Sequence, residues 1–153
     1  KDVVKESLFD TQKHSTWDFA WYESMAKNQF FTDIETIARS KNNAIIESNF
    51  LGDDKERLRV LLGDSVNLLE IHCYSDGLSS FKRVVKRNES KARHPGHHDR
   101  RWYPKIFIQS IFHNLGVNIG AHKPLNLSDN TICVNTTDIA NVDYGQLMSI
   151  VNK

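Results

Sequence analysis

Cysteine is scarce in this chain, and long apolar runs are missing. The two cysteines, Cys73 and Cys133, each lie in an apolar run typical of a strand, which favours buried free thiols over a disulfide framework. No apolar stretch reaches the roughly 18 residues that span a bilayer, and no signal-peptide pattern opens the sequence. These absences predict a cytoplasmic protein without a membrane partner.

Charge is nearly balanced overall but uneven along the chain. Residues 82–105 hold nine Lys/Arg against two Asp/Glu, whereas the remainder holds eleven against seventeen, within a formal net charge of +1. A hydrophobic content of 39% over 153 residues is enough for one compact domain with a core, which excludes a disordered or fibrous protein. We therefore expect a single domain over residues 1–153 with one basic region.

The hydrophobic periods predict alternating helices and strands. A helix after residue 141 would be capped by Asn141 or Asp143. Strands separated by helices imply βαβ units and a parallel sheet, which is an α/β fold. The predicted helices cover residues 1–11, 15–41, 53–63, 104–116 and 141–153, and the predicted strands cover 44–47, 66–73 and 131–135.

Two features carry functional chemistry. Glu47 ends the first predicted strand, and ligands of open α/β sheets bind at such carboxyl ends. Arg83 and Arg87 are four positions apart, so any helix that carries them presents both on one face. Without further information they are a solvated basic helix face, which is the commoner meaning of such a run.

The stretch "SKARHPGHHDRR", residues 90–101, concentrates histidine and basic residues. His94, His97, His98 and Asp99 supply metal-ligand chemistry, but their spacing is not a zinc pattern and no cysteine is nearby. Trp102 and Tyr103, which follow the stretch, could stack on the bases of a nucleic acid. A phosphate also suits this composition, and a plain structural turn at Pro95-Gly96 is the fourth interpretation.

Four motifs in order resemble the P-loop kinases of the zeta-toxin and polynucleotide-kinase-like group, often labelled AAA-family ATP-binding proteins. "KDVVKESLFDT" resembles the segment after the second strand of that family, and "AIIESNF" resembles its third-strand motif. "RHPGHHD" is similar to the His-Pro-Gly-His motif that follows the family's arginine-bearing lid, here about residues 76–105. "ICVNTTDIANVDYGQLMSIV" resembles its last strand and helix.

One part of the family pattern is missing. None of the seven glycines is followed by lysine, so the phosphate-binding loop GxxxxGK[ST] is absent. We expect a kinase domain that lacks its first strand, loop and helix, roughly 30 residues, and that is inactive as this chain alone. The resemblance implies a three-layer fold, with a parallel sheet between helices on both faces.

The resemblance also implies catalytic roles. Asp2 matches the acid that orients or deprotonates the acceptor hydroxyl, and Lys5 matches a basic residue that contacts the phosphate or the acceptor; a helix cap is the alternative for Asp2. Arg83 and Arg87 match lid arginines that clamp the phosphates of ATP and stabilise charge in the transition state.

Binding roles follow in the same way. Glu47 matches an acid that reaches Mg²⁺, and Ser48 and Asn49 could hydrogen-bond the substrate. Asn135 stands where the family often has Asp, on the nucleotide side. The motif assigns Arg93 to the phosphates of the nucleotide.

Among the four interpretations of the histidine-rich stretch, the resemblance of this motif favours phosphate binding. It implies that His94 and His97 lie in the acceptor or phosphate pocket. The implied function is a kinase that transfers the γ-phosphate of ATP, with magnesium, to a hydroxyl of a small molecule or a nucleic-acid end. The alternative is a degenerate kinase fold that binds a partner through the basic surface 82–105. An apolar sheet edge left without its neighbouring strand would also favour self-association.

Overall fold

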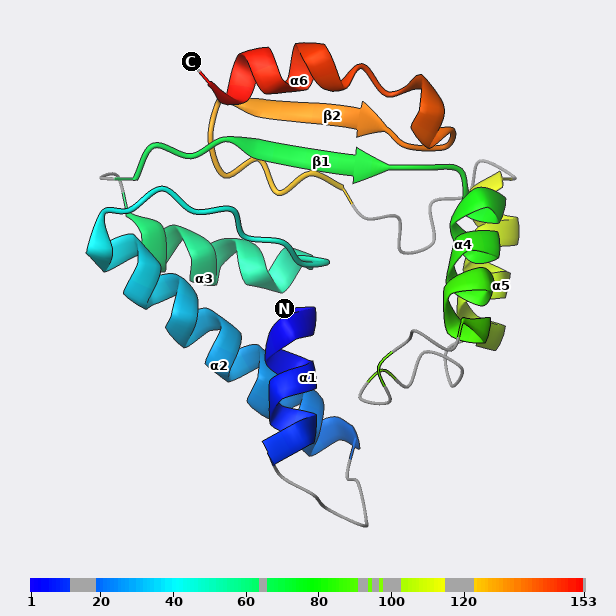
Figure 1. The fold of residues 1–153 in the computed structure, drawn as a ribbon, viewed down its shortest axis with the longest axis horizontal. Helices are drawn as coiled ribbons and strands as arrows, with labels where there is room; N and C mark the ends of the chain where they lie inside the picture. Colours follow the sequence, from blue (N-terminus) through cyan, green and yellow to red (C-terminus); the bar gives the residue numbers. More distant parts are fainter. Residues whose placement is uncertain are drawn as a thin grey trace. The chain divides into compact units, whose positions relative to one another are not determined.

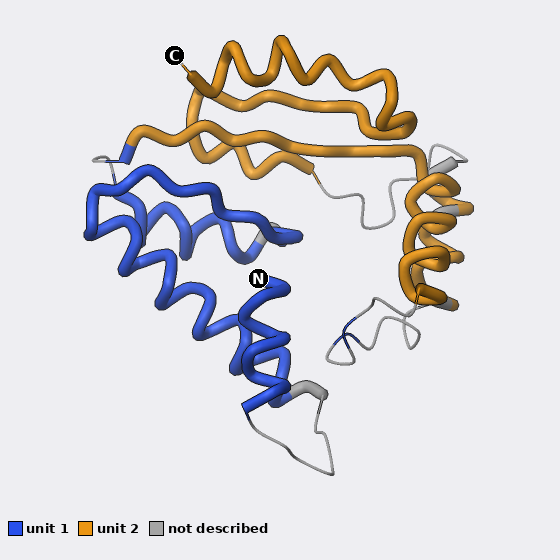
Figure 2. Tube along the Cα trace, in the orientation of Figure 1, with its two compact units in different colours: residues 1–66, 92–98 blue, residues 67–91, 99–153 orange. Residues whose placement is uncertain are grey.

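The computed structural model describes residues 1–11, 19–63, 66–90, 94, 97, 103–114 and 123–152. The chain divides into two compact units (Figure 2). Unit 1 comprises residues 1–66 and 92–98, and unit 2 comprises residues 67–91 and 99–153. The predictions on Arg93, Pro95, Gly96, His98, Asp99 and Trp102 lie outside the described residues.

Unit 1 is built from three helices: α1 (Asp2–Thr11), α2 (Phe19–Ser40) and α3 (Gly52–Leu62) (Figure 1). The helices α1 and α2 fall within ranges that the hydrophobic period predicts, and α3 begins one residue before its predicted range of 53–63. The core lies along one stripe of α2, where side chains repeat every three or four positions and meet one residue of α3. These buried residues are Tyr22, Ala26, Phe30, Phe31, Ile34 and Leu58.

A buried carboxylate joins α3 to α2. Asp54 is 5% exposed and accepts a hydrogen bond from the Leu51 main-chain nitrogen at 2.9 Å, which satisfies one donor at the start of α3. The same carboxylate pairs with the Lys27 ammonium of α2, with an N–O distance of 2.6 Å. This pairing compensates the charge that burial of Asp54 would otherwise leave isolated.

The strand predicted at residues 44–47 does not form in the described structure. Ile46, Ser48 and Phe50 are half-buried while their neighbours are exposed, so the segment has the period of an extended chain. The Phe50 ring lies 6.0 Å from that of Phe30, but no strand pairs with the segment among the described residues. A strand needs a partner for its N–H and C=O groups, and the hydrophobic period alone does not provide one.

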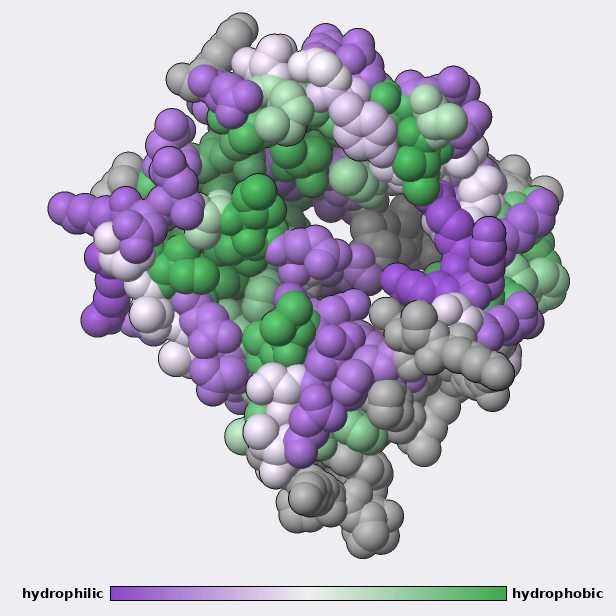
Figure 3. All heavy atoms as spheres, viewed as in Figure 1, coloured by the Kyte–Doolittle hydropathy of each residue, from purple (hydrophilic) through white to green (hydrophobic). Residues whose placement is uncertain are grey.

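The apolar run that suggested a buried strand is therefore largely at the surface. Ile45 is 95% exposed, and Leu51 and Val60 are also exposed. Apolar side chains reach the surface over the 42–51 segment and α3 on the face that Figure 3 shows.

Unit 2 contains a parallel two-stranded sheet of β1 (Glu70–Tyr74) and β2 (Thr131–Asn135). Its register runs from Glu70 opposite Thr131 to Tyr74 opposite Asn135, so both strands end at the same edge (Figure 1). The parallel pairing is as predicted. The connection between the strands contains α4 (Gly77–Glu89) and α5 (Tyr103–Asn114), and β2 is followed by the 3-10 helix η2 (Ile139–Asn141) and by α6 (Tyr144–Val151).

The cysteines are exposed, which corrects the expectation of buried thiols. Cys133 lies opposite His72, whereas Cys73 lies opposite Val134. Because successive residues of a strand face opposite sides, the two thiols lie on opposite faces of the sheet. A two-stranded sheet also has too little width to bury both faces. No described helix is long and apolar enough to cross a membrane.

Candidate functional site

In unit 1, the start of α1 meets the segment that follows the predicted first strand. The Lys1 main-chain nitrogen donates to the Glu47 carbonyl oxygen at 3.1 Å. This contact joins the main chain just before α1, whose first turn carries Asp2, to the main chain at Glu47, which Ser48 and Asn49 follow in the sequence. The residues that the sequence assigned separately to acceptor and metal binding therefore lie in two segments that this hydrogen bond connects.

Lys5 is engaged by α2. Its ammonium pairs with the Glu23 carboxylate, and its side chain is 15% exposed. The ammonium of Lys1 lies 3.9 Å from the same carboxylate. The carboxylate of Glu23 thus balances the positive charge that the sequence assigned to phosphate or acceptor binding.

Tyr22, the residue before Glu23 in α2, also contacts α1. Its hydroxyl donates to the Lys5 carbonyl oxygen, and the residue is only 1% exposed. Burial, and after it the carboxylates of Glu23, Glu6 and Asp10, together raise the pKa of Tyr22 to about 12. Three carboxylates therefore act on the buried hydroxyl where α1 meets α2.

The histidine motif packs along α1. The Nε2 atom of His97 lies 3.0 Å from Glu6 Oε1, and that of His94 lies 3.2 Å from Asp10 Oδ1. The His97 main-chain nitrogen donates to the His94 carbonyl oxygen at 3.1 Å, which closes a turn. The His94 ring also meets the Phe9 ring edge-on at 5.4 Å. The His97 side chain is only 2% exposed.

Both described histidines of the motif thus face carboxylates of α1. Among the described residues, no group of three His, Cys, Asp or Glu side chains has the arrangement of a metal site. The metal interpretation of the histidine stretch also depended on His98 and Asp99, which lie outside this part of the chain.

In unit 2, two of the predicted nucleotide-side residues, Arg83 and Asn135, have contacts at the edge where β1 and β2 end. The Thr136 main-chain nitrogen donates to the Tyr74 carbonyl oxygen at 2.7 Å. The Asp76 main-chain nitrogen then donates to the Thr137 hydroxyl at 3.0 Å. The loops after the two strands are thereby joined, at the edge where α/β folds bind ligands.

Asp76 is the residue just before α4 at this edge. Its side chain accepts from the Ser79 main-chain nitrogen at 2.8 Å, which caps α4. Hydrogen bonds from the Ser79 side chain and then from its main chain lower the pKa of the Asp76 carboxyl below its usual value. The start of α4 is therefore fixed by a carboxylate that stays ionised.

The two arginines of α4, Arg83 and Arg87, have different surroundings. Arg83 Nη1 donates to the Thr136 carbonyl oxygen at 2.8 Å, and its Nε donates to the Ser79 carbonyl oxygen at 3.3 Å. The guanidinium of Arg83 thus ties α4 to the loop after β2. Arg87 lies one turn further along α4 and is exposed, as are Lys82 and Lys86.

Asn135 uses its side chain within its own loop. Its Oδ1 accepts from the Thr137 main-chain nitrogen at 2.9 Å, which turns the chain after β2. An aspartate would accept this hydrogen bond equally well, so the turn itself does not require an asparagine at this position.

Sequence reasoning missed the partners that hold the predicted site residues within each unit. These partners are Glu6, Asp10, Tyr22, Glu23 and Thr136. Glu6 and Asp10 follow Asp2 at intervals of four along α1, so the spacing does carry a signal for a shared face. Their partners come from distant parts of the sequence, where no pattern indicates them.

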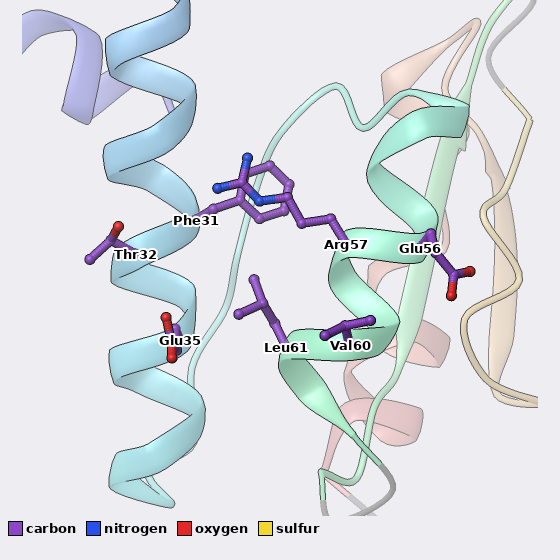
Figure 4. Close-up of a pocket in the computed structure, with 7 residues that line it drawn as sticks. All are labelled: Phe31, Thr32, Glu35, Glu56, Arg57, Val60 and Leu61. Atoms are coloured by element: carbon purple, nitrogen blue, oxygen red, sulfur yellow. The ribbon is translucent and has the colours of Figure 1, made fainter.

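A cavity of about 310 Å³ lies elsewhere in unit 1, between α2 and α3 (Figure 4). The Arg57 guanidinium covers the Phe31 ring at 4.0 Å, which is a cation–π contact. The other lining residues are Thr32, Glu35, Glu56, Val60 and Leu61. None of the residues predicted from the sequence as site residues lines this cavity.

No protein-family model matches the chain. No curated protein matches it either. A solved structure of a presumed kinase from Chloroflexus aurantiacus J-10-fl is similar to it, with a TM-score of 0.78 and 28% sequence identity. The similarity covers 99% of this chain and 80% of that chain, so the fold is kinase-like over nearly its whole length.

Proposed function

We propose that this chain is part of an ATP-dependent kinase that transfers the γ-phosphate to a hydroxyl of a small molecule or a nucleic-acid end. The observation that carries the proposal is the similarity to the presumed kinase over 99% of the chain. The resemblance to the zeta-toxin and polynucleotide-kinase-like group supplies the finer assignment. It includes the three-layer P-loop architecture, of which β1 and β2 would be a part.

On the acceptor side, the carboxylate of Asp2 orients the acceptor hydroxyl and takes its proton as the oxygen attacks phosphorus. Lys5 contacts the phosphate or the acceptor, and Glu23 is its partner when no substrate is bound. The contact between Lys1 and Glu47 supports this assignment, because it connects the segment that leads into Asp2 to the segment that carries Ser48 and Asn49, the proposed substrate-binding residues.

On the nucleotide side, the proposed residues are Arg83, Arg87, Arg93 and Asn135. The hydrogen bond from Arg83 to Thr136 favours a supporting role, in which Arg83 holds α4 at the edge of the sheet. Exposed Arg87, one turn on, would then contact the phosphates and stabilise the charge that develops on them. The loop turned by Asn135 would border the nucleotide.

The residues present suit magnesium and part of an ATP site. Mg²⁺ binds through one or two carboxylates together with substrate phosphates, and Glu47 and Asp2 lie in adjoining segments. When bound, Mg²⁺ would neutralise charge on the transferred phosphate. The phosphate-binding loop GxxxxGK[ST] does not occur in the 153 residues, so we propose that this chain alone does not catalyse transfer.

The test uses the protein as its gene encodes it. ATP hydrolysis and phosphorylated product are measured with magnesium across a panel of sugars, nucleosides, aminoglycosides and oligonucleotides that end in a 5′-hydroxyl. We expect at least one acceptor to be phosphorylated, and Arg87→Gln to lower transfer about 100-fold. Arg59→Gln removes the same charge from an exposed position of α3 and is the control. Absence of both product and hydrolysis would overturn the proposal.

A second candidate function is a binding module with a degenerate kinase fold. It is favoured by the exposed cations Lys82, Lys86 and Arg87 on one helix and by the missing phosphate-binding loop. Reversing the charges of Lys82 and Lys86 to Glu should then abolish partner binding while the fold is kept. Partner binding that survives this reversal would count against the module.

A further inference from the structure

The row of carboxylates on α1 connects the proposed base to the histidine turn. Asp2, Glu6 and Asp10 follow one another at intervals of four residues, so they lie along one face of the helix. Each step is about 6 Å along the axis, at 1.5 Å per residue. Asp2 is therefore the next member of the row whose other two members meet His97 and His94.

The contact between His97 and Glu6 is the more buried of the two. The His97 side chain is 2% exposed and that of Glu6 is 39% exposed, whereas the side chains of His94 and Asp10 are 24% and 67% exposed. In both contacts it is the Nε2 atom of the histidine that faces a carboxylate of α1. Because it is buried, His97 has little surface left with which to contact a substrate.

The neighbouring row of α1 is held by α2. The Tyr22 hydroxyl donates to the Lys5 carbonyl oxygen, and the Glu23 carboxylate pairs with the Lys5 ammonium. Contacts on two rows of one helix fix its rotation about its own axis. The contacts of Glu6 and Asp10 with the two histidines therefore add a second constraint on that rotation to the one from α2.

We propose that His97 is a positioning residue: through Glu6 it sets the rotation of α1 and thereby the direction of the Asp2 carboxylate. This inference rests on the proposed function for the role of Asp2, but the contact itself does not. The role that the motif implied for His97, binding of the acceptor or the phosphate, is replaced by an indirect one. His94, through Asp10, supports the same orientation from the exposed end of the row.

A small rotation would matter for phosphoryl transfer. Side chains lie about 5–6 Å from a helix axis, so a rotation of about 20° moves a carboxylate by roughly 2 Å. Misplacement of a reacting group by about 1 Å can cost on the order of 100-fold in rate. A residue that fixes this rotation can therefore control the rate without touching the substrate.

The first test measures amide hydrogen exchange in α1 and needs no activity. We expect His97→Ala to speed exchange in residues 2–11 at least about tenfold, with exchange in α3 unchanged. His97→Gln keeps an N–H donor that can reach Glu6, and it should restore exchange to within about threefold of the parent protein. Glu56→Gln, at an exposed carboxylate of α3, is the control. Unchanged exchange in α1 of His97→Ala would overturn the proposal.

The second test addresses catalysis in the protein that its gene encodes. His97→Ala should lower kcat about 10- to 100-fold with little change in the KM for ATP, and His97→Gln should recover most of it. If His97→Ala does not fold, Glu6→Gln provides the same comparison, because the amide weakens the contact without removing bulk. Faster exchange in α1 without loss of kcat would overturn the positioning role. A parent protein without kinase activity would contradict the proposed function, while the exchange experiment would still decide the contact between the turn and α1.

Discussion

Arg83 Nη1 donates to the Thr136 carbonyl oxygen at 2.8 Å, which joins α4 to the loop after β2. We expect Arg83→Gln to lower the free energy of unfolding by about 1–3 kcal/mol, because a charge-assisted hydrogen bond is lost. Arg87→Gln, at an exposed position of the same helix, should change it by less than about 0.5 kcal/mol. Urea unfolding followed by circular dichroism measures both. Equal effects of the two substitutions would contradict the distinction between a supporting and a phosphate-binding arginine.

Acid stability should depend on the cap of α4. Hydrogen bonds from Ser79 lower the pKa of the Asp76 carboxyl in the folded protein. Its contribution is therefore complete above the unfolded value of about 3.9 and is lost as the pH falls through the lowered folded value. Asp76→Ala should cost about 1 kcal/mol at pH 7, and the difference from the parent protein should shrink below about pH 4. Thermal unfolding from pH 7 to pH 2 measures this; a constant difference would argue against the cap.

Alkaline stability should depend on Tyr22. Burial raises its pKa to about 12, compared with about 10 in an unfolded chain. The contribution of the neutral phenol is complete below about pH 10 and is lost as the pH rises toward 12. Tyr22→Phe removes the ionisable hydroxyl, so the free energy of unfolding of this variant should fall less steeply with pH over that window than that of the parent protein. Tyr74→Phe, at a residue that is 46% exposed, is the control and should follow the parent protein.

The buried carboxylate at the start of α3 should be important for stability. Asp54 accepts from the Leu51 main-chain nitrogen and pairs with Lys27. We expect Asp54→Ala to lower the free energy of unfolding by about 1–3 kcal/mol, because the helix loses a cap and Lys27 loses its partner. Asp53→Ala, at the exposed neighbouring position, should stay within about 0.5 kcal/mol of the parent protein. Chemical unfolding measures the free energy of both variants. A loss in Asp54→Ala alone would show that the buried contacts of Asp54 stabilise the protein, whereas equal losses would show that any negative charge in the first turn does so.

The thiols should be reactive in the folded protein. Cys73 and Cys133 are exposed, and their side chains point to opposite faces of the sheet. A thiol reagent should therefore modify both without denaturant, and mild oxidation should not form a bond between them within one chain. Cys73→Ser should leave one reactive thiol. Modification that begins only after unfolding would show that both thiols are covered in solution.

Local patterns in the sequence predicted much of the secondary structure. The helical period places α2 and α6 within the expected ranges and misses the start of α3 by one residue. Asp143, one of two predicted candidates, caps α6 by accepting from the Gln146 nitrogen at 2.8 Å. The strand patterns found β1 and β2 and their parallel pairing. These features depend on neighbouring residues, because hydrogen bonds and side-chain faces repeat over a few positions.

The errors arose where a pattern needs a distant partner. Residues 44–47 have the composition of a buried strand, yet strand formation requires a second strand, and none pairs with them in the described structure. The cysteines were expected to be buried because their strands are apolar, but the burial of a strand is decided by what covers the sheet.

The sequence by itself determined the periods of the helices, the two paired strands and the residue types of the candidate site. Only the tertiary structure decided how these residues are used. It directs Arg83 to Thr136 across 53 positions and His97 to Glu6 across 91. Such contacts follow from how separate elements pack, and packing depends on the whole chain because no local pattern encodes which distant side chain will lie within hydrogen-bonding distance.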